Sequence, residues 1–209
     1  MIEPKVPPHR ASQSTKGQIC WWWCGLALAL SLFGCSSSEP STAALQPWSH
    51  TGSKGVYRID FSKSWNQETP ATFNEHADLA ASMSGEIFLI VIPQELPVID
   101  GVPTPDAVAL KRASVEIMRS SIESFRIDHE MPTTLGTTAA EAVFASGVVS
   151  EIPISYLLTY VTRGKWGYQI VGWAPAYKKS TLATQLDEVL GTWKFPGGDL
   201  SEPQDPSRP

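Results

Sequence analysis

The stretch Ile154–Ala174 reads ISYLLTYVTRGKWGYQIVGWA and holds two apolar segments on either side of a short polar turn. The segments, Ile154–Thr162 and Lys165–Ala174, are rich in β-branched and aromatic residues, which are typical of strands. Gly164 lies between them, and a glycine in a short loop between two such segments indicates a tight hairpin turn. The stretch therefore predicts two antiparallel strands that are neighbours in a sheet.

Other segments of the chain also have strand character. Val56–Phe61 alternates between apolar and polar residues, as expected for a strand with one buried face. Ile87–Ile92 is an unbroken apolar run that we expect to end at Pro93 and to be covered on both faces. Glu141–Val149 is apolar and rich in β-formers. The sheet therefore needs other elements to cover its faces.

Two helical patterns can provide that cover. The first spans Pro105–Phe125, with Thr104 as the expected N-cap, and the second spans Ala176–Trp193. Their apolar residues recur at helical spacing: Val108, Val115, Met118, Ile122 and Phe125 in the first, and Leu182, Leu186, Val189, Leu190 and Trp193 in the second. Hairpins with long helices between them predict an α+β fold, a largely antiparallel β-sheet sandwiched by helices in a single domain.

Three segments resemble one known family. They are VYRIDFSKSW (Val56–Trp65), GKWGYQIVGWAP (Gly164–Pro175) and LGTWKF (Leu190–Phe195). Together they look like the PsbP/Mog-like domains, which include the photosystem II extrinsic P subunit, the Ran-binding Mog proteins and DcrB-type bacterial lipoproteins. The resemblance implies a three-layer α/β/α fold and a role in binding or assembly rather than in catalysis.

The N-terminal region has the pattern of an export signal. Three basic residues precede an apolar run from Ile19 to Phe33, which is shorter than the roughly 20 residues that a membrane-spanning helix needs. LFGC, at Leu32–Cys35, resembles the lipobox of bacterial lipoproteins. This resemblance implies cleavage between Gly34 and Cys35 and attachment of diacylglycerol to the Cys35 sulfur, with palmitate as a suitable label. The alternative is an uncleaved N-terminal anchor.

These features divide the chain into four parts. Residues 1–34 are the expected lipoprotein signal peptide, residues 35–47 the lipidated cysteine and a flexible tether, and residues 48–195 the globular domain. Residues 196–209 contain four prolines and two glycines, which predicts a disordered tail. Ser36 follows the cysteine, and by resemblance this implies the periplasmic face of the outer membrane in a Gram-negative cell.

Composition limits the partners of the mature chain. Without the signal it has 13 basic and 20 acidic residues, a net charge of about −7. This negative charge disfavours binding to the phosphate backbone of a nucleic acid, so we expect no nucleic-acid partner. Cys20 and Cys24 lie in the signal, which leaves Cys35 without a partner for a disulfide or a cysteine metal site. We expect contact with the membrane through the lipid and with another envelope protein.

Asp128-His129-Glu130 is the most suggestive catalytic pattern, because flanking acids can orient a general base or help to bind a metal. In a regular strand, however, His129 shares a face with Ile127 and Met131, while Asp128 and Glu130 lie on the other face. We therefore expect a structural or surface histidine. No motif for a nucleophile, a phosphate-binding loop or a zinc site occurs, so we expect no enzyme activity, cofactor or metal.

Exposed aromatic residues are the remaining candidates for a site. Trp65 and Trp166 could contact a partner or ligand, as could His129, since aromatic residues are enriched at binding hot spots. The alternative for each is core packing. The sequence thus favours a lipid-anchored envelope protein with a non-catalytic binding or scaffolding domain. The alternatives are an envelope enzyme with an unrecognised histidine or carboxylate site and a small-molecule-binding lipoprotein.

Overall fold

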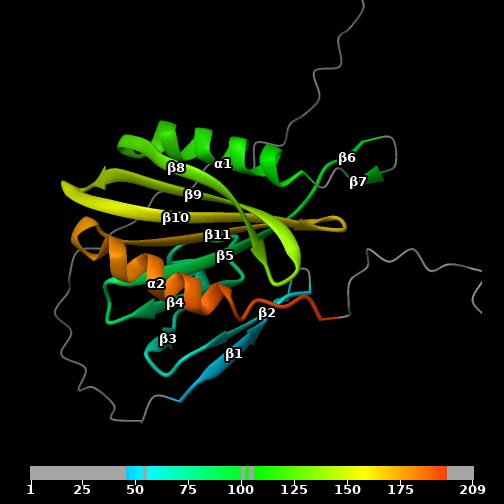
Figure 1. The fold of residues 1–209 in the computed structure, drawn as a ribbon, viewed down its shortest axis with the longest axis horizontal. Coiled ribbons are helices and arrows are strands. Elements are labelled where there is room, and N and C mark those ends of the chain that lie inside the picture. The colour runs from blue at the N-terminus through cyan, green and yellow to red at the C-terminus, as the bar shows by residue number, and fades with distance from the viewer. Residues whose placement is uncertain (1–45, 54–55, 100–101, 104–105, 197–209) are drawn as a thin grey trace, which may run out of the picture.

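The computed structural model describes residues 46–53, 56–99, 102–103 and 106–196. Seven strands there form one antiparallel sheet, in the order β3-β4-β5-β11-β10-β9-β8 (Figure 1). In that order the strands are β3 (Trp65–Gln67), β4 (Leu79–Met83), β5 (Ile87–Glu95), β11 (Trp166–Pro175), β10 (Ile152–Arg163), β9 (Thr138–Val149) and β8 (Glu123–Leu135). Two smaller sheets pair β1 (Trp48–Thr51) with β2 (Arg58–Phe61) and β6 (Val98–Ile99) with β7 (Val102–Pro103).

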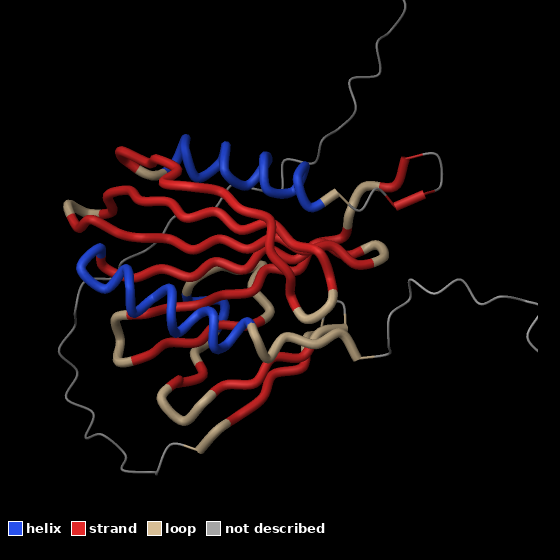
Figure 2. The backbone as a smooth tube through the Cα atoms, viewed as in Figure 1, coloured by secondary structure: helices blue, strands red, loops and turns tan. Residues whose placement is uncertain are grey.

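One helix lies on each side of the seven-stranded sheet (Figure 2). Helix α1 (Ala107–Ser121) contacts β8 to β11, whereas α2 (Lys179–Leu190) contacts β10 and β11 from the opposite face. A 3₁₀ turn, η2 (Ala176–Lys178), leads into α2, and a second one, η1 (Pro70–Thr72), precedes β4. The predicted α+β fold, an antiparallel sheet between helices, is confirmed.

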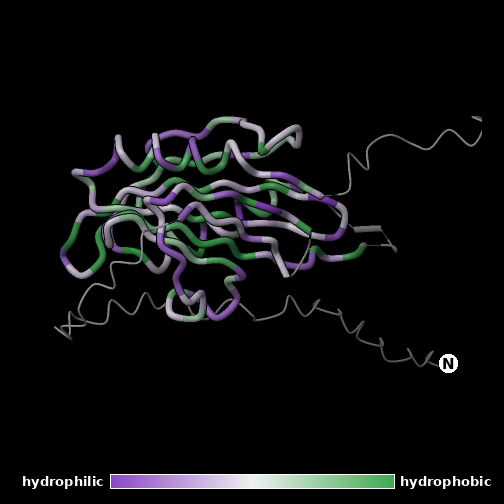
Figure 3. The backbone as a smooth tube through the Cα atoms, turned by 90° about the horizontal axis from the view of Figure 1, so that it is seen from below, coloured by the Kyte–Doolittle hydropathy of each residue, from purple (hydrophilic) through white to green (hydrophobic). Residues whose placement is uncertain are grey.

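The sheet separates two hydrophobic cores, here called the α1-side core and the α2-side core. In β5, Leu89 and Val91 belong to the α2-side core, whereas Ile90 and Ile92 belong to the α1-side core. This alternation explains the unbroken apolar run, since both faces of the strand are covered. The tube coloured by hydropathy has both hydrophobic and hydrophilic stretches along its helices and strands (Figure 3).

The C-terminal hairpin forms as the sequence predicts. Strands β10 and β11 pair from Ile154 opposite Pro175 to Arg163 opposite Trp166. Gly164 in the connection has φ +57°, a conformation that a glycine adopts without a steric cost. The stretch Ile154–Ala174 therefore supplies two neighbouring strands near the centre of the sheet.

Three predicted boundaries in β5 and α1 are wrong. Strand β5 continues through Pro93 to Glu95. The last residue of β5 that pairs with β4 is Val91. Because Pro93 lies beyond this pairing, its missing N–H costs no hydrogen bond to β4. The first helix begins at Ala107 and is capped by Asp106, whose Oδ1 accepts a hydrogen bond from the Val108 N–H at 2.9 Å. Thr104 lies outside the described residues.

The third boundary is the end of the first helix. It stops at Ser121, and strand β8 begins two residues later, so Phe125 lies in a strand. Strand β8 as a whole was not predicted. It carries mostly exposed side chains at one edge of the sheet, and an edge strand shows little of the apolar alternation that marks a buried one.

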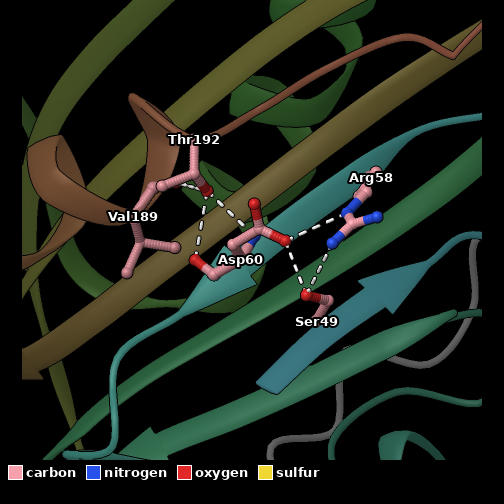
Figure 4. Close-up of polar contacts among 5 residues, drawn as sticks. All are labelled: Ser49, Arg58, Asp60, Val189 and Thr192. Atoms are coloured by element: carbon pink, nitrogen blue, oxygen red, sulfur yellow. Dashed lines mark hydrogen bonds and ion pairs between the residues drawn. The ribbon is translucent and has the colours of Figure 1, made fainter. Parts of the chain in front are cut away.

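Hydrogen bonds around Asp60 fasten the β1–β2 sheet to the end of α2 (Figure 4). The Thr192 hydroxyl accepts from the Asp60 N–H at 2.9 Å and lies 3.1 Å from the Asp60 carbonyl oxygen and 2.7 Å from that of Val189. Asp60 Oδ1 accepts from the Ser49 hydroxyl at 2.6 Å and from Arg58 Nε at 3.0 Å. These contacts join the β1–β2 sheet to the C-terminal end of α2.

Among the helices of the described part of the chain, none has the length and apolar character that crossing a membrane requires. The predicted signal with Gly34, Cys35 and the predicted tether up to residue 45 lie outside the described residues, as do residues 197–209 of the predicted tail.

Candidate functional site

The structure separates the three aromatic candidates. Trp65 is a core residue with 1% of its surface exposed, and its ring packs edge-on against Phe61, so the prediction that it contacts a partner is wrong. Trp166 is half-buried against the α2-side core, with Lys165 Nζ 5.7 Å from its ring centre. His129 is exposed and is the one of the three that lines a pocket.

A β-bulge places His129 in an unexpected orientation. Ile127 pairs with Ala145 and His129 pairs with Phe144, so Asp128 is an extra residue in β8. Ile127 packs on the α1-side core, whereas Asp128 and His129 both face the α2 side, where they meet Lys179 and Phe144. The predicted alternation is wrong at this point because a bulge inserts one residue without changing the partner strand.

The pocket beside His129 has a volume of about 510 Å³ and lies between the N-terminal end of α2 and strands β8 and β9. We call it the α2 pocket. It is lined by His129, Phe144, Ala176, Tyr177, Lys179, Ser180 and Ala183. The rings of His129 and Phe144 stack with their centres 4.2 Å apart and an angle of 13° between their planes. The pocket is therefore an aromatic hollow with a small-residue wall.

Lys179, a lining residue of the α2 pocket, belongs to a group of ion pairs. Lys179 Nζ lies 2.6 Å from Asp128 Oδ2, and Arg126 Nε lies 3.4 Å from Asp128 Oδ1. The hydrogen bond from Lys179 lowers the pKa of Asp128, and the charge of Arg126 adds to this effect. Asp128 is thus an ionised partner of two cations, which leaves it unsuited to accept a proton from His129.

A further ion pair lies next to Tyr177 of the lining. The Tyr177 hydroxyl donates to Glu86 Oε1 at 2.5 Å, and Lys178 Nζ lies 3.1 Å from Glu86 Oε2. The hydrogen bond with Glu86 raises the pKa of Tyr177, and the two bonds together lower the pKa of Glu86. Tyr177 is held in place in this way although 73% of its surface is exposed.

The pattern Asp128-His129-Glu130 does not converge on one point. Glu130 is on the α1 side, where its Oε2 lies 2.8 Å from Lys111 Nζ, and Asp128 is bound to Lys179 and Arg126. Within the described ranges, no three histidine, cysteine or acidic residues are grouped so that they could hold a metal ion. The arrangement around His129 suits contact with a ring or a charge rather than proton transfer.

A second polar cluster, centred on Asp78, was not predicted. Its carboxylate accepts hydrogen bonds from the Ser53 N–H and the Tyr57 hydroxyl at 3.0 Å each and from the Ser53 hydroxyl. His50 Nε2 lies 3.5 Å from Asp78 Oδ2. The Asp78 side chain is 6% exposed, so four donor groups enclose it and leave no open face for a ligand.

The Asp78 cluster is structural in character. Burial alone would raise the pKa of Asp78, but the hydrogen bonds from His50, Ser53 and Tyr57 outweigh it and lower the pKa to about 2. Burial, together with the Asp78 charge, raises the pKa of Tyr57. The donors are separated from Asp78 by 21 to 28 positions in the chain, so no local pattern in the sequence could have indicated this cluster.

No protein-family model and no curated protein matches this chain. Solved structures do match it. Cyanobacterial PsbP (CyanoP) from Synechocystis sp. PCC 6803 has a TM-score of 0.54 and 12% sequence identity, over 76% of this chain and 97% of that one. The fold is PsbP-like. This agrees with the resemblance found in the sequence.

A second match shares the PsbP-like fold. LpqN, described as involved in cell envelope biogenesis of Mycobacterium tuberculosis, has a TM-score of 0.52 and 13% identity, over 71% of this chain and 90% of that one. At such identities the PsbP-like architecture is what the chains have in common. The shared fold therefore does not specify the chemistry of the α2 pocket, which depends on the residues of this chain.

Proposed function

We propose that this chain is a lipid-anchored protein of the bacterial cell envelope whose PsbP-like domain binds another envelope protein through the α2 pocket, without catalysing a reaction. The observation that carries the proposal is the exposed aromatic character of the pocket. His129 is exposed and Tyr177 is 73% exposed, and both line the same hollow. Aromatic rings gathered around a hollow are typical of protein-binding hot spots.

The electrostatics of the pocket favour binding over catalysis. Enzyme sites place titratable groups in buried surroundings that shift their pKa towards the working pH. Here Glu86 accepts from Tyr177 and Lys178, and Asp128 accepts from Lys179, and these contacts lower both pKa values further from neutrality. His129 has Phe144, rather than an acid, as the contact of its ring. The pocket thus presents fixed charges and ring surfaces.

The proposed location depends on the N-terminal sequence. The basic region, the short apolar run and LFGC at Leu32–Cys35 are the features of a lipoprotein signal. A lipid on Cys35 and a tether of residues 36–47 would hold the domain close to a bilayer, at the outer membrane if the cell is Gram-negative. LpqN, which has a similar fold, is itself described as involved in cell envelope biogenesis, and this supports the proposal.

Replacing the lipidated residue tests the anchor. We expect Cys35→Ser to abolish uptake of labelled palmitate and to move the protein from the detergent phase to the aqueous phase, because two or more acyl chains are what make binding to a bilayer stable. Wild-type protein is the reference. Unchanged labelling and partitioning of the variant, or an intact mass that begins at Met1 without modification, would refute the lipid anchor.

Site-specific photocrosslinking in intact cells tests the binding role. A photoreactive residue at Ser180, which lines the pocket, is compared with one at Glu188, an exposed position on the same helix outside the pocket lining. We expect a discrete protein adduct from position 180 that disappears when Phe144→Ala is added, and none from position 188. Equal adducts from both positions, or none from position 180, would contradict a role for the α2 pocket.

A further inference from the structure

We infer, on the basis of the proposed function, that the α2 pocket recognises a protein segment in which an aromatic side chain stands next to an acidic residue. This inference names the chemistry of the partner, which the proposed function leaves open. It depends on three features of the pocket: its ring surfaces, its charge and its open shape.

The ring surfaces indicate an aromatic guest. Phe144 stacks on one face of the His129 imidazole at 4.2 Å, and His129 remains exposed, so it offers further ring surface to a guest. Ala176 and Ala183 give the wall of the pocket little bulk and leave space beside these rings. Aromatic rings attract one another in stacked or edge-on arrangements, which makes a planar side chain a suitable guest.

The charge around the pocket indicates an acidic neighbour. Lys179 lines the pocket, and no acidic residue is among the lining residues. Next to this lining, Arg126, Lys178 and Lys179 share two carboxylates, those of Asp128 and Glu86. The rim therefore carries an excess of positive charge, whereas the whole chain has a net charge of −5. Complementary charge selects partners and orients their approach, so an acidic residue beside the aromatic guest fits this rim.

The open shape indicates a protein segment rather than a small molecule. Small-molecule sites bury most of the ligand, but the lining of the α2 pocket includes residues that are themselves exposed, such as His129, Tyr177 and Ser180. Such a hollow covers a guest from one side only. Met131, two residues after His129 in β8, is 44% exposed and extends the apolar surface along the strand, where a longer segment can continue.

A peptide selection tests the inference. The full chain in lipid nanodiscs is offered a displayed library of random dodecapeptides, and enriched peptides are measured by fluorescence anisotropy. We expect enriched sequences to contain Trp, Tyr or Phe next to Asp or Glu. Phe144→Ala removes a ring contact and should weaken peptide binding about three- to tenfold. Lys179→Gln should weaken peptide binding about threefold, and high salt should weaken peptide binding further.

Matched controls accompany these variants. Lys165→Gln removes a lysine of similar exposure from the β10–β11 hairpin, where it pairs with Glu95, and should leave peptide binding unchanged. If Phe144→Ala does not fold, His129→Ala at an exposed position provides the same test. Enrichment of basic peptides or of peptides without an aromatic residue, no enrichment at all, or binding insensitive to both pocket variants would overturn the inference.

The outcome separates the inference from the proposed function. If position 180 still crosslinks to a protein in cells, but the captured segment has no acidic residue beside an aromatic one, the inference is wrong and the binding role stands. If phenylacetate, which joins a ring to a carboxylate, binds as tightly as the enriched peptides, the partner is a small molecule and the inference is also wrong. Absence of any adduct from position 180 when Phe144 is unchanged refutes the binding role.

Discussion

Asp78 shows how one residue fastens the start of the domain to the central sheet. Its carboxylate receives hydrogen bonds from residues in and after β1, and the lowered pKa of about 2 means that these bonds stabilise the folded, ionised form. A lowered pKa adds stability that is complete above the unfolded pKa of about 4 and is lost as the pH falls towards 2. The cluster therefore contributes to stability at neutral pH and fails in acid.

Asp78→Asn tests this account. We expect the free energy of unfolding at pH 7 to fall by about 2 kcal/mol, since a shift of one pKa unit corresponds to 1.36 kcal/mol, and we expect the variant to lose less stability than the wild type between pH 4 and pH 2. Urea unfolding at several pH values measures both effects. Asp187→Asn, at an exposed position on α2, is the control. A variant with wild-type pH dependence would show that Asp78 does not carry this effect.

Gly172 shows how one residue determines the packing of α2 against the sheet. A Cβ atom at this position in β11 would lie 2.0 Å from Leu186 Cδ1, so the glycine is what allows α2 to lie so close to the sheet. We expect Gly172→Ala to cost about 1–3 kcal/mol through overpacking. In a double-mutant cycle with Leu186→Ala, the combined loss should be smaller than the sum of the single losses. Additive losses would show that the two residues do not clash.

At the scale of elements, sequence patterns predicted the strands β2, β5, β9, β10 and β11 and both helices, whereas the buried strand β4 was not predicted. Ile87–Ile92 and Ile154–Thr162 have apolar runs that burial on both faces requires, and Leu182, Leu186 and Val189 mark the inner side of α2. Strand β8 lacked such a pattern because it lies at the edge of the sheet. Its bulge at Asp128, which turns His129 towards α2, arises from pairing with β9 and has no local sequence signature.

The N-terminal cap of α1 provides a test at this scale. Asp106 accepts a hydrogen bond from the Val108 N–H, so we expect Asp106→Ala to lower the free energy of unfolding by about 1 kcal/mol. Asp106→Asn keeps an accepting oxygen and should change stability by only a few tenths of that value. Thermal unfolding followed by circular dichroism measures both variants. Equal losses in both would mean that charge, rather than the capping hydrogen bond, stabilises the helix.

At the scale of the molecule, the chain closes on itself. Lys194 forms backbone hydrogen bonds with Arg58 at 2.8 and 2.9 Å, and Thr192 binds Asp60 from the end of α2. The first and last described elements therefore support each other across the α2-side core. The boundaries of the domain should accordingly lie just outside these contacts.

Limited proteolysis of the full chain tests those boundaries. We expect a resistant fragment that begins near Trp48 and ends near Phe195, because backbone in strands and helices is protected while the predicted tether and tail are open to proteases. Mass spectrometry of the fragment identifies its ends. Early cleavage within β1 or β2, before any loss from the two termini, would contradict a single domain over residues 48–195.

The amino-acid sequence by itself determined the class of fold, because apolar periodicity and turn residues act locally and specify which segments become strands and helices. It also carries the expected lipid signal at Cys35, which is a local motif. Tertiary structure alone decided that Trp65 is buried, that Asp128 and His129 share a face and that Phe144 meets Tyr177 around one pocket. These features depend on contacts between residues far apart in the chain, which no local pattern records.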